Sequence, residues 1–183
     1  MNGVDKGLVE LRGRPIISYI VEKLRPQVDT IVINANRNHQ AYQALTDTSV
    51  VADDIDGFLG PLAGMVTGMT ACNSRWVLTV PCDSPFLSSN LCEKLMNAAV
   101  AAEAEICVAH DGVRLQPVFA LISTNLENNI RRFLSSGGRK IDQWYKSENM
   151  ATCDFSDEKL MFANVNTPAD KRKISNELKM RQP

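Results

Sequence analysis

The chain has 183 residues, with 20 Lys and Arg against 21 Asp and Glu, so its formal net charge is −1. A chain of this length can bury roughly 70% of its unfolded surface around one core, and we expect residues 1–183 to form a single domain. Near-neutral charge argues against a nucleic-acid surface, which needs a basic stripe to displace phosphate counterions. An anionic ligand must therefore be met by a few local charges.

Targeting and metal signals are sparse. No apolar run approaches the roughly 18 residues that span a bilayer, and the first residues lack a hydrophobic signal core, so we expect a cytoplasmic protein without membrane contact. The five cysteines include no CxxC pair, and we interpret them as reduced and mostly buried. His39 and His110 lie far apart in sequence, with no Cys or carboxylate at ligand spacing, which argues against a zinc site.

Apolar segments alternate with helical patterns along the whole chain. This order predicts an α/β fold in three layers, with a mostly parallel sheet flanked by helices. The expected strands are β-branched or apolar through their middle, as strands covered on both faces must be. They are residues 30–34, 49–53, 76–80, 105–109 and 116–122.

The helices carry start and stop signals. Pro15 precedes an apolar stripe that ends at Pro26, and Ser88 or Ser89 could cap a helix that begins near Leu91. Residues 167–170, Thr-Pro-Ala-Asp, resemble a capping box with Asp in place of Glu, and they predict a terminal helix to about Met180. Residues 135–138, Ser-Ser-Gly-Gly, indicate a loop.

Polar residues that end an apolar strand are the first candidates for function, because ligands collect at the carboxyl ends of strands in open α/β sheets. Asp83 follows the strand at 76–80, between Pro81 and Pro85 in a rigid turn. One carboxylate with substrate phosphates is a usual environment for Mg²⁺. Asp83 could equally cap the next helix or turn, and its position alone leaves both readings open.

Asn34 and Asp53 end two other strands. An ionised carboxylate only accepts hydrogen bonds, so it can take the two adjacent N–H donors of guanine, whereas adenine presents no such pair. Asn offers both a donor and an acceptor. The commoner role for both residues is a turn at the end of a strand.

Two further features suit an anionic ligand. Lys6 lies between Gly3 and Gly7, where the chain can approach a ligand closely, although an exposed lysine near a terminus is usually only solvated. The small residues at 60–65 lead into a helix, whose N-terminal amides could face an anion or whose glycines could permit tight packing on the sheet.

Taken together, these segments resemble the molybdenum cofactor guanylyltransferases, which attach GMP to molybdopterin. The resemblance runs from Gly3 to about Asp170 and rests on short segments in the same order throughout. They are residues 3–7, 34–37, 53–54, 60–65, 81–85, 110–112 and 164–168. The resemblance implies a Rossmann-like nucleotidyltransferase fold of the nucleotide-diphospho-sugar transferase type.

The resemblance also implies roles for individual residues. Lys6, Asn34, Asp53 and Asp83 match the family's GTP-contacting positions, and Asp83 matches its Mg²⁺ ligand, so Asp83 and Lys6 are the expected catalytic residues. In a weaker correspondence, Asn164 and Asn166 match a motif on the side of the pterin substrate. The implied partners are GTP, molybdopterin or Mo-molybdopterin, and proteins that deliver or accept the cofactor.

One departure from the family is large. The family begins with a strand and a glycine-rich loop whose amides cradle the nucleotide phosphates, whereas this sequence opens at what looks like the end of that loop. We therefore expect the first strand and most of the loop to be absent from residues 1–183.

The implied reaction is in-line attack by the molybdopterin phosphate on the α-phosphorus of GTP, with pyrophosphate leaving. A related enzyme acting on another phosphorylated acceptor, or a GTP-binding module without catalysis, would share much of this pattern. A basic cluster could receive the second anionic substrate, but a solvated helix face is the commoner reading. Its members are Arg131, Arg132, Arg139 and Lys140.

Overall fold

The computed structural model describes residues 5–54 and 60–181. The strands are β1 (Glu10–Leu11), β2 (Arg14–Pro15), β3 (Val32–Asn34), β4 (Ser49–Val51), β5 (Trp76–Thr79), β6 (Ile106–His110), β7 (Leu115–Ser123) and β8 (Met150–Asp154). The helices are α1 (Ile16–Leu24), α2 (His39–Thr46), α3 (Pro61–Ala71), α4 (Leu91–Ala101), α5 (Glu127–Ser135), α6 (Ile141–Tyr145) and α7 (Pro168–Arg181). Short 3₁₀ helices are η1 (Lys6–Leu8), η2 (Thr124–Leu126) and η3 (Lys159–Phe162).

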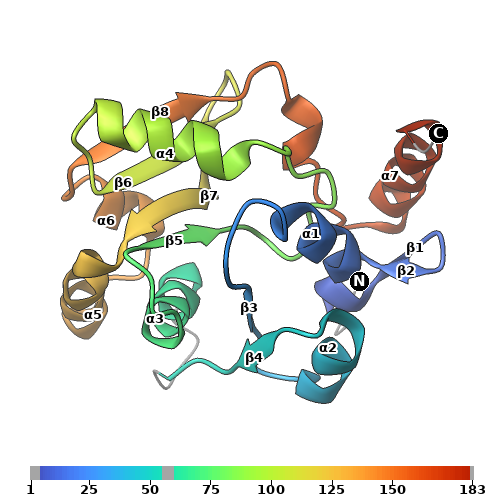
Figure 1. Cartoon of the computed structure of the whole chain (residues 1–183), viewed down its shortest axis with the longest axis horizontal. Coiled ribbons are helices and arrows are strands. Elements are labelled where there is room, and N and C mark those ends of the chain that lie inside the picture. Colours follow the sequence, from blue (N-terminus) through green and yellow to red (C-terminus); the bar gives the residue numbers. More distant parts are fainter. Residues whose placement is uncertain (1–4, 55–59, 182–183) are drawn as a thin grey trace.

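The strands form two main groups, which are visible in Figure 1. A four-stranded sheet has the order β5-β7-β6-β8, in which β6 and β8 are parallel and β7 is antiparallel to its neighbours β5 and β6. β3 and β4 form a separate parallel pair, and β1 and β2 form a small hairpin. The predicted α/β fold is confirmed, and the sheet is mixed because β7 returns directly from β6.

Helices cover both faces of the four-stranded sheet, because successive side chains of a strand point to opposite faces. Ile106 and Val108 of β6 pack with α3, α5 and α6, whereas Cys107 and Ala109 pack with α1 and α4. All four side chains are fully buried. This alternation produces the three layers expected from the sequence.

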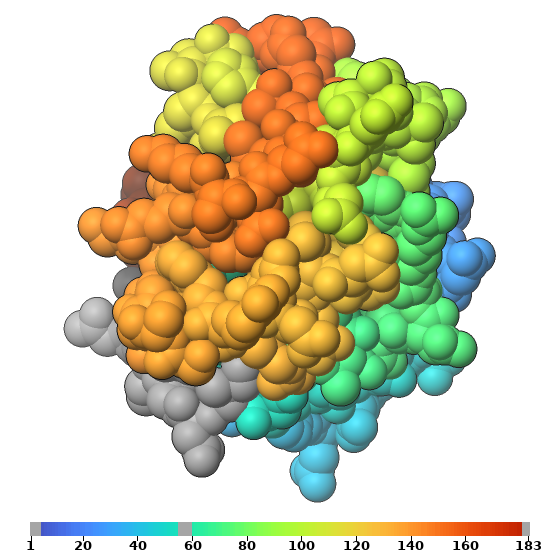
Figure 2. Space-filling view, turned by 90° about the vertical axis from the view of Figure 1, so that its left-hand side faces the viewer, coloured from blue at the N-terminus to red at the C-terminus, as the bar shows by residue number. Residues whose placement is uncertain are grey.

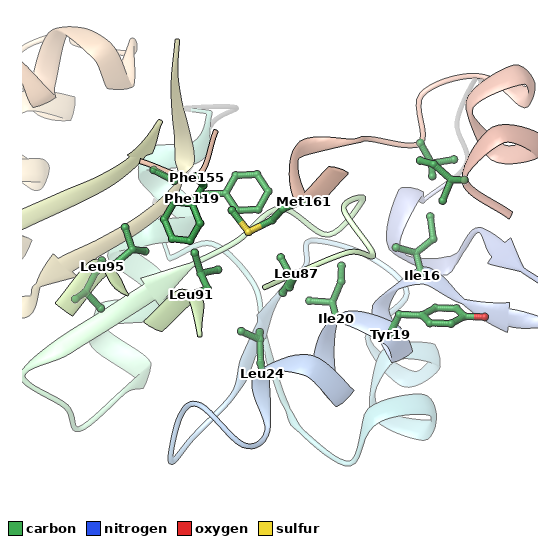
Figure 3. Close-up of a cluster of buried hydrophobic side chains, with 14 of the residues drawn as sticks. Ile16, Tyr19, Ile20, Leu24, Leu87, Leu91, Leu95, Phe119, Phe155 and Met161 are labelled. Atoms are coloured by element: carbon green, nitrogen blue, oxygen red, sulfur yellow. The ribbon is translucent and has the colours of Figure 1, made fainter. Parts of the chain in front are cut away.

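The apolar cluster that contains Cys107 and Ala109 joins distant parts of the chain (Figure 3). Ile20 and Leu24 of α1 lie near Leu87, and Leu91 of α4 lies near Phe119. Each of these side chains is at most 7% exposed. Burial of large apolar side chains is worth roughly 1.5–3 kcal/mol each, so this cluster fixes α1 against the sheet.

β3 and β5 face each other across a cavity of about 720 Å³. Both strands line it, with α1 and α3 contributing apolar residues such as Ile20 and Met65. Within residues 5–54 and 60–181, β3 is paired only with β4, and β5 only with β7. The apolar side chains of β5 are consequently only half-buried, although the sequence predicts a strand covered on both faces.

The structure confirms one of the predicted helix caps and contradicts another. The capping box is confirmed: Thr167 Oγ1 accepts the Asp170 N–H at 3.1 Å, and Asp170 Oδ2 accepts the Thr167 N–H at 2.8 Å. The predicted serine cap of α4 is wrong, because Asn90 occupies the cap position and Ser88 Oγ contacts the Asn90 side chain instead. Pro15 precedes α1 as its cap residue.

Candidate functional site

Asp83 sits in the turn that follows β5 and is 5% exposed. Its Oδ2 accepts a hydrogen bond from Lys6 Nζ at 2.9 Å, and the Lys6 side chain remains 48% exposed. Lys6 lies in η1, far away in sequence from Asp83. The fold therefore brings the two expected catalytic residues together, with a shielded carboxylate and an accessible ammonium.

The segment around Val165 crosses the same turn. Asn166 Oδ1 accepts a second bond from Lys6 Nζ at 2.6 Å, and Asn164 Oδ1 accepts the Ser84 hydroxyl at 2.6 Å. The Val165 N–H donates to the Asp83 carbonyl at 3.1 Å. Both asparagines of the second-substrate prediction therefore border the Lys6–Asp83 pair.

Asn34 and Asp53 come together at the ends of β3 and β4. The two strands are parallel with Asn34 opposite Val51, so the residues that follow them meet at one edge. A Cβ placed on Gly64 of α3 would lie 2.7 Å from Asn34 Oδ1 and 3.8 Å from Asp53 Oδ1. Both oxygens therefore face one point of α3, which can come this close only because residue 64 is glycine.

Asp53 carries an unusual oxygen. Its Oδ1 has less than 1 Å² of solvent-accessible surface and no hydrogen-bond partner in the described part of the chain. A buried acceptor without a donor costs roughly 1–3 kcal/mol, so its presence calls for an explanation, and a donor supplied by a ligand is one.

Gly60, which precedes α3, adopts φ +74 and ψ −163, a region open almost only to glycine. A Cβ there would face the Arg139 carbonyl at 3.9 Å. The small residues at 60–65 thus serve both a tight turn into α3 and close packing against the end of β3, as one of the two sequence readings proposed.

Residues of both groups adjoin one cavity. Asn34, Asp53 and Gly64 line it beside β3 and β4, and Pro81 and Cys82 line it beside β5. Lys6 and Asp83 are not among its lining residues, so the charged pair lies next to the cavity, beyond Cys82.

Sequence reasoning missed Asp5 and Tyr42. The Tyr42 hydroxyl donates to Asp5 Oδ1, and burial together with this bond raises the pKa of Tyr42. Asp5 also accepts a bond from Asn38 Nδ2 at 3.3 Å and pairs with Arg37 at 3.6 Å. This network anchors η1, which carries Lys6, to α2. Only the position of Asp5 beside Lys6 could have indicated it.

The basic cluster belongs to α5 and the segment that follows it, which Figure 2 shows on the face turned to the viewer, and two of its members make contacts within the protein. Arg131 NH2 donates to Asp54 at 2.8 Å, and this bond lowers the pKa of Asp54. Arg139 NH1 donates to the Leu134 carbonyl at 2.8 Å and so caps the end of α5. These contacts support the reading of a structural helix face, and Arg131 and Arg139 are committed to it.

Metal donors and cysteines complete the description. Among the described residues, no group of three or more His, Cys, Asp or Glu side chains could hold a metal ion by itself.

All five cysteines are free, but only Cys107 is buried, so the prediction of mostly buried cysteines is wrong. Cys82 is exposed because it follows β5 at the open cavity.

Comparison with known proteins identifies the family. Residues 1–150 match the MobA-like NTP transferase domain. The chain belongs to the MobA-like NTP transferase family. Its relatives in this family include the molybdenum cofactor guanylyltransferase of Shewanella sediminis, which is 45% identical over 96% of this chain and 89% of the relative. The enzyme of the same name from Shewanella sp. strain MR-4 is 45% identical over 97% of this chain and 90% of the relative.

Solved structures agree on the fold of this family member. The molybdopterin-guanine dinucleotide biosynthesis protein A of Archaeoglobus fulgidus superposes with a TM-score of 0.80 at 22% identity, covering 98% of this chain and 93% of that one. A 2-C-methyl-D-erythritol 4-phosphate cytidylyltransferase of Thermus thermophilus gives 0.72 at 14% identity, covering 95% and 94%. The nucleotidyltransferase fold is therefore confirmed.

None of the helices in the described ranges is long and apolar enough to cross a membrane.

Proposed function

We propose that the chain transfers GMP from GTP to the terminal phosphate of molybdopterin, with release of pyrophosphate. The observation that carries the proposal is that two polar groups at strand ends adjoin one cavity: Asn34 and Asp53, which line it, and the Lys6–Asp83 pair, which follows its lining at Cys82. The names of the Shewanella relatives support the same reaction.

The group formed by Asn34 and Asp53 suits guanine. Asp53 Oδ1 lacks a donor, and guanine presents two adjacent N–H donors on its Watson–Crick edge. Asn34 Oδ1 faces the same point of α3 and adds a second polar contact. Adenine would leave the Asp53 oxygen unsatisfied, so this group would favour GTP over ATP.

The Lys6–Asp83 pair suits the phosphates. Lys6 Nζ, which is half-exposed, can turn from Asp83 and Asn166 toward a phosphate oxygen. Asp83 fits Mg²⁺, since this ion is usually held by one or two carboxylates together with substrate phosphates and does not need a closed set of protein ligands. When bound there, Mg²⁺ would offset negative charge on the transferring phosphate.

The chemistry needs no protein base. A phosphate monoester has a second pKa near 6, so the acceptor is largely dianionic at neutral pH. Its oxygen forms a bond to the α-phosphorus of GTP while the bond from that phosphorus to the β-bridging oxygen breaks, and pyrophosphate leaves with that electron pair. The contribution of the protein is then positioning and charge stabilisation by Lys6 and Asp83.

Asn164 and Asn166 border the place where the acceptor phosphate would have to arrive. Asn166 contacts Lys6 directly, so we assign it to the second substrate together with Asn164. Asn164 is already bonded to Ser84, and its role would be to shape the Asp83 turn beside the pterin.

Product analysis tests the proposal. The full chain is incubated with Mg²⁺, molybdopterin and each of GTP, ATP and CTP, and pyrophosphate and the product mass are measured. We expect one pyrophosphate per guanine dinucleotide, with GTP preferred. Transfer to a sugar phosphate but not to molybdopterin would support the related-enzyme alternative, and GTP binding without pyrophosphate release would support a binding module.

A further inference from the structure

Asn36 lies two residues beyond β3 and makes a reciprocal contact with Asp53, which lies two residues beyond β4. Asn36 Nδ2 donates to Asp53 Oδ2 at 2.8 Å, and Asn36 Oδ1 accepts the Asp53 N–H at 2.8 Å. The parallel register, with Asn34 opposite Val51, places these two residues side by side. One side-chain amide thus holds both the backbone and the carboxylate of Asp53.

The contact gives the two oxygens of the Asp53 carboxylate different surroundings. Oδ2 is occupied by Asn36, whereas Oδ1 is left without a partner and faces Asn34 and Gly64. Without Asn36, rotation of the carboxylate could bring either oxygen to any donor nearby. With it, Oδ2 is bound within the protein, and Oδ1 keeps an unpaired acceptor that faces Asn34 and Gly64 and not the solvent.

Asparagine suits this task because its amide donates and accepts at once. An aspartate at position 36 could accept the Asp53 N–H but could not donate to the carboxylate, and it would place a like charge beside it. An alanine would make neither bond. The requirement is therefore for an amide, and the contact is more specific than a general tie between two loops.

We infer that Asn36 is a positioning residue for base selection, which orients Asp53 so that Oδ1 meets the N–H donors of a purine bearing a 2-amino group. The inference rests on the proposed function, in which Asp53 reads guanine. It adds a residue that does not itself touch the nucleotide.

The test compares GTP with inosine triphosphate, which lacks the 2-amino group, in Asn36→Ala, Asn36→Asp and Asp53→Ala. Equilibrium binding and KM are measured with Mg²⁺ for both nucleotides. Gln40→Ala, which removes an exposed amide from the adjacent α2, is the matched control. Thermal unfolding shows whether each variant folds.

We expect Asn36→Ala and Asn36→Asp to raise the KM for GTP about three- to tenfold, the range that loss of a net hydrogen bond gives. Inosine triphosphate should be affected less, so the preference for GTP falls, while kcat changes little. Gln40→Ala should retain the wild-type preference.

Other results would overturn the inference in distinguishable ways. If Asp53→Ala loses the preference but the Asn36 variants keep it, or if they weaken both nucleotides equally, Asn36 is only a structural tie and the proposed function stands. If Asp53→Ala also keeps the preference, or if wild-type protein binds no GTP, the proposed base recognition fails and the inference fails with it.

Discussion

The four-stranded sheet and the β3–β4 pair differ in how completely they are packed. β6 lies between two strands, and Ile106 to Ala109 are fully buried. β3 and β5 each have one edge without a strand partner in the described ranges, and their apolar residues border the cavity. The comparison indicates that β6 and its neighbours supply stability, and under the proposed function the strand ends beside the cavity supply recognition.

The largest expected effect concerns two leucines paired across β5 and β7, Leu78 and Leu121. Leu121 is 1% exposed, whereas Leu78 is half-buried beside the cavity. Leu121→Ala should lower the free energy of unfolding by about 2–5 kcal/mol, as expected for a buried leucine. Leu78→Ala should cost clearly less, since part of its surface is already outside the core. Chemical denaturation measures both, and equal losses would mean that Leu78 is as buried in solution as Leu121.

Two glycines of α3 test the recognition side of the comparison. Gly64→Ala would place a Cβ 2.7 Å from Asn34 Oδ1, whereas a Cβ on Gly68 meets nothing within 4 Å. Gly64→Ala should weaken GTP binding about tenfold, the upper size of one lost neutral hydrogen bond. Gly68→Ala should leave binding unchanged and stabilise the helix by roughly 0.5–1 kcal/mol. Calorimetric titration decides, and equal GTP affinities in the two variants would argue against Asn34 as a contact.

The smallest effect is a pH dependence in the turn between β6 and β7. The N–H groups of Arg114 and Val113 donate to Asp111, as does Gln116, and they lower the pKa of Asp111 to about 2. A depressed pKa contributes stability that is present above the unfolded value near 4 and is lost as the pH falls toward 2.

Asp111→Ala should therefore lower the melting temperature at pH 7 and pH 5, with a smaller difference from wild type at pH 3. The melting temperatures are compared by calorimetry. A difference that stays constant from pH 7 to pH 3 would contradict this assignment.

Much of the fold could be predicted from periodicity. The strand at β6 and the capping box at Thr167 depend on local patterns, and both are confirmed. The half-burial of β5 could not be predicted, because an apolar run does not reveal whether a strand has a partner on each edge. The cap of α4 was missed because its Cys92 N–H donates to the side chain of Gln27, which is distant in sequence, and no local capping pattern reveals such a bond.

In the candidate site, too, single residues could be identified from the sequence, whereas contacts between distant residues could not. The ends of the apolar runs identified Asp53 and Asp83 as candidates, and the family resemblance gave them roles. The sequence could not show that Lys6 meets Asp83, or that Asn36 holds Asp53, since these pairs depend on long-range folding.

The central claim is that the nucleotide site has a base-reading group at Asn34 and Asp53 and a phosphate-holding group at Lys6 and Asp83. Calorimetric binding of GTP and ATP, with and without Mg²⁺, tests it in wild type, Asp53→Ala and Asp83→Ala. We predict that Asp53→Ala loses the preference for GTP but keeps the gain from Mg²⁺, and that Asp83→Ala loses the gain from Mg²⁺ but keeps the preference. If either variant loses both properties or neither, the division of the site into a base-reading and a phosphate-holding group is wrong.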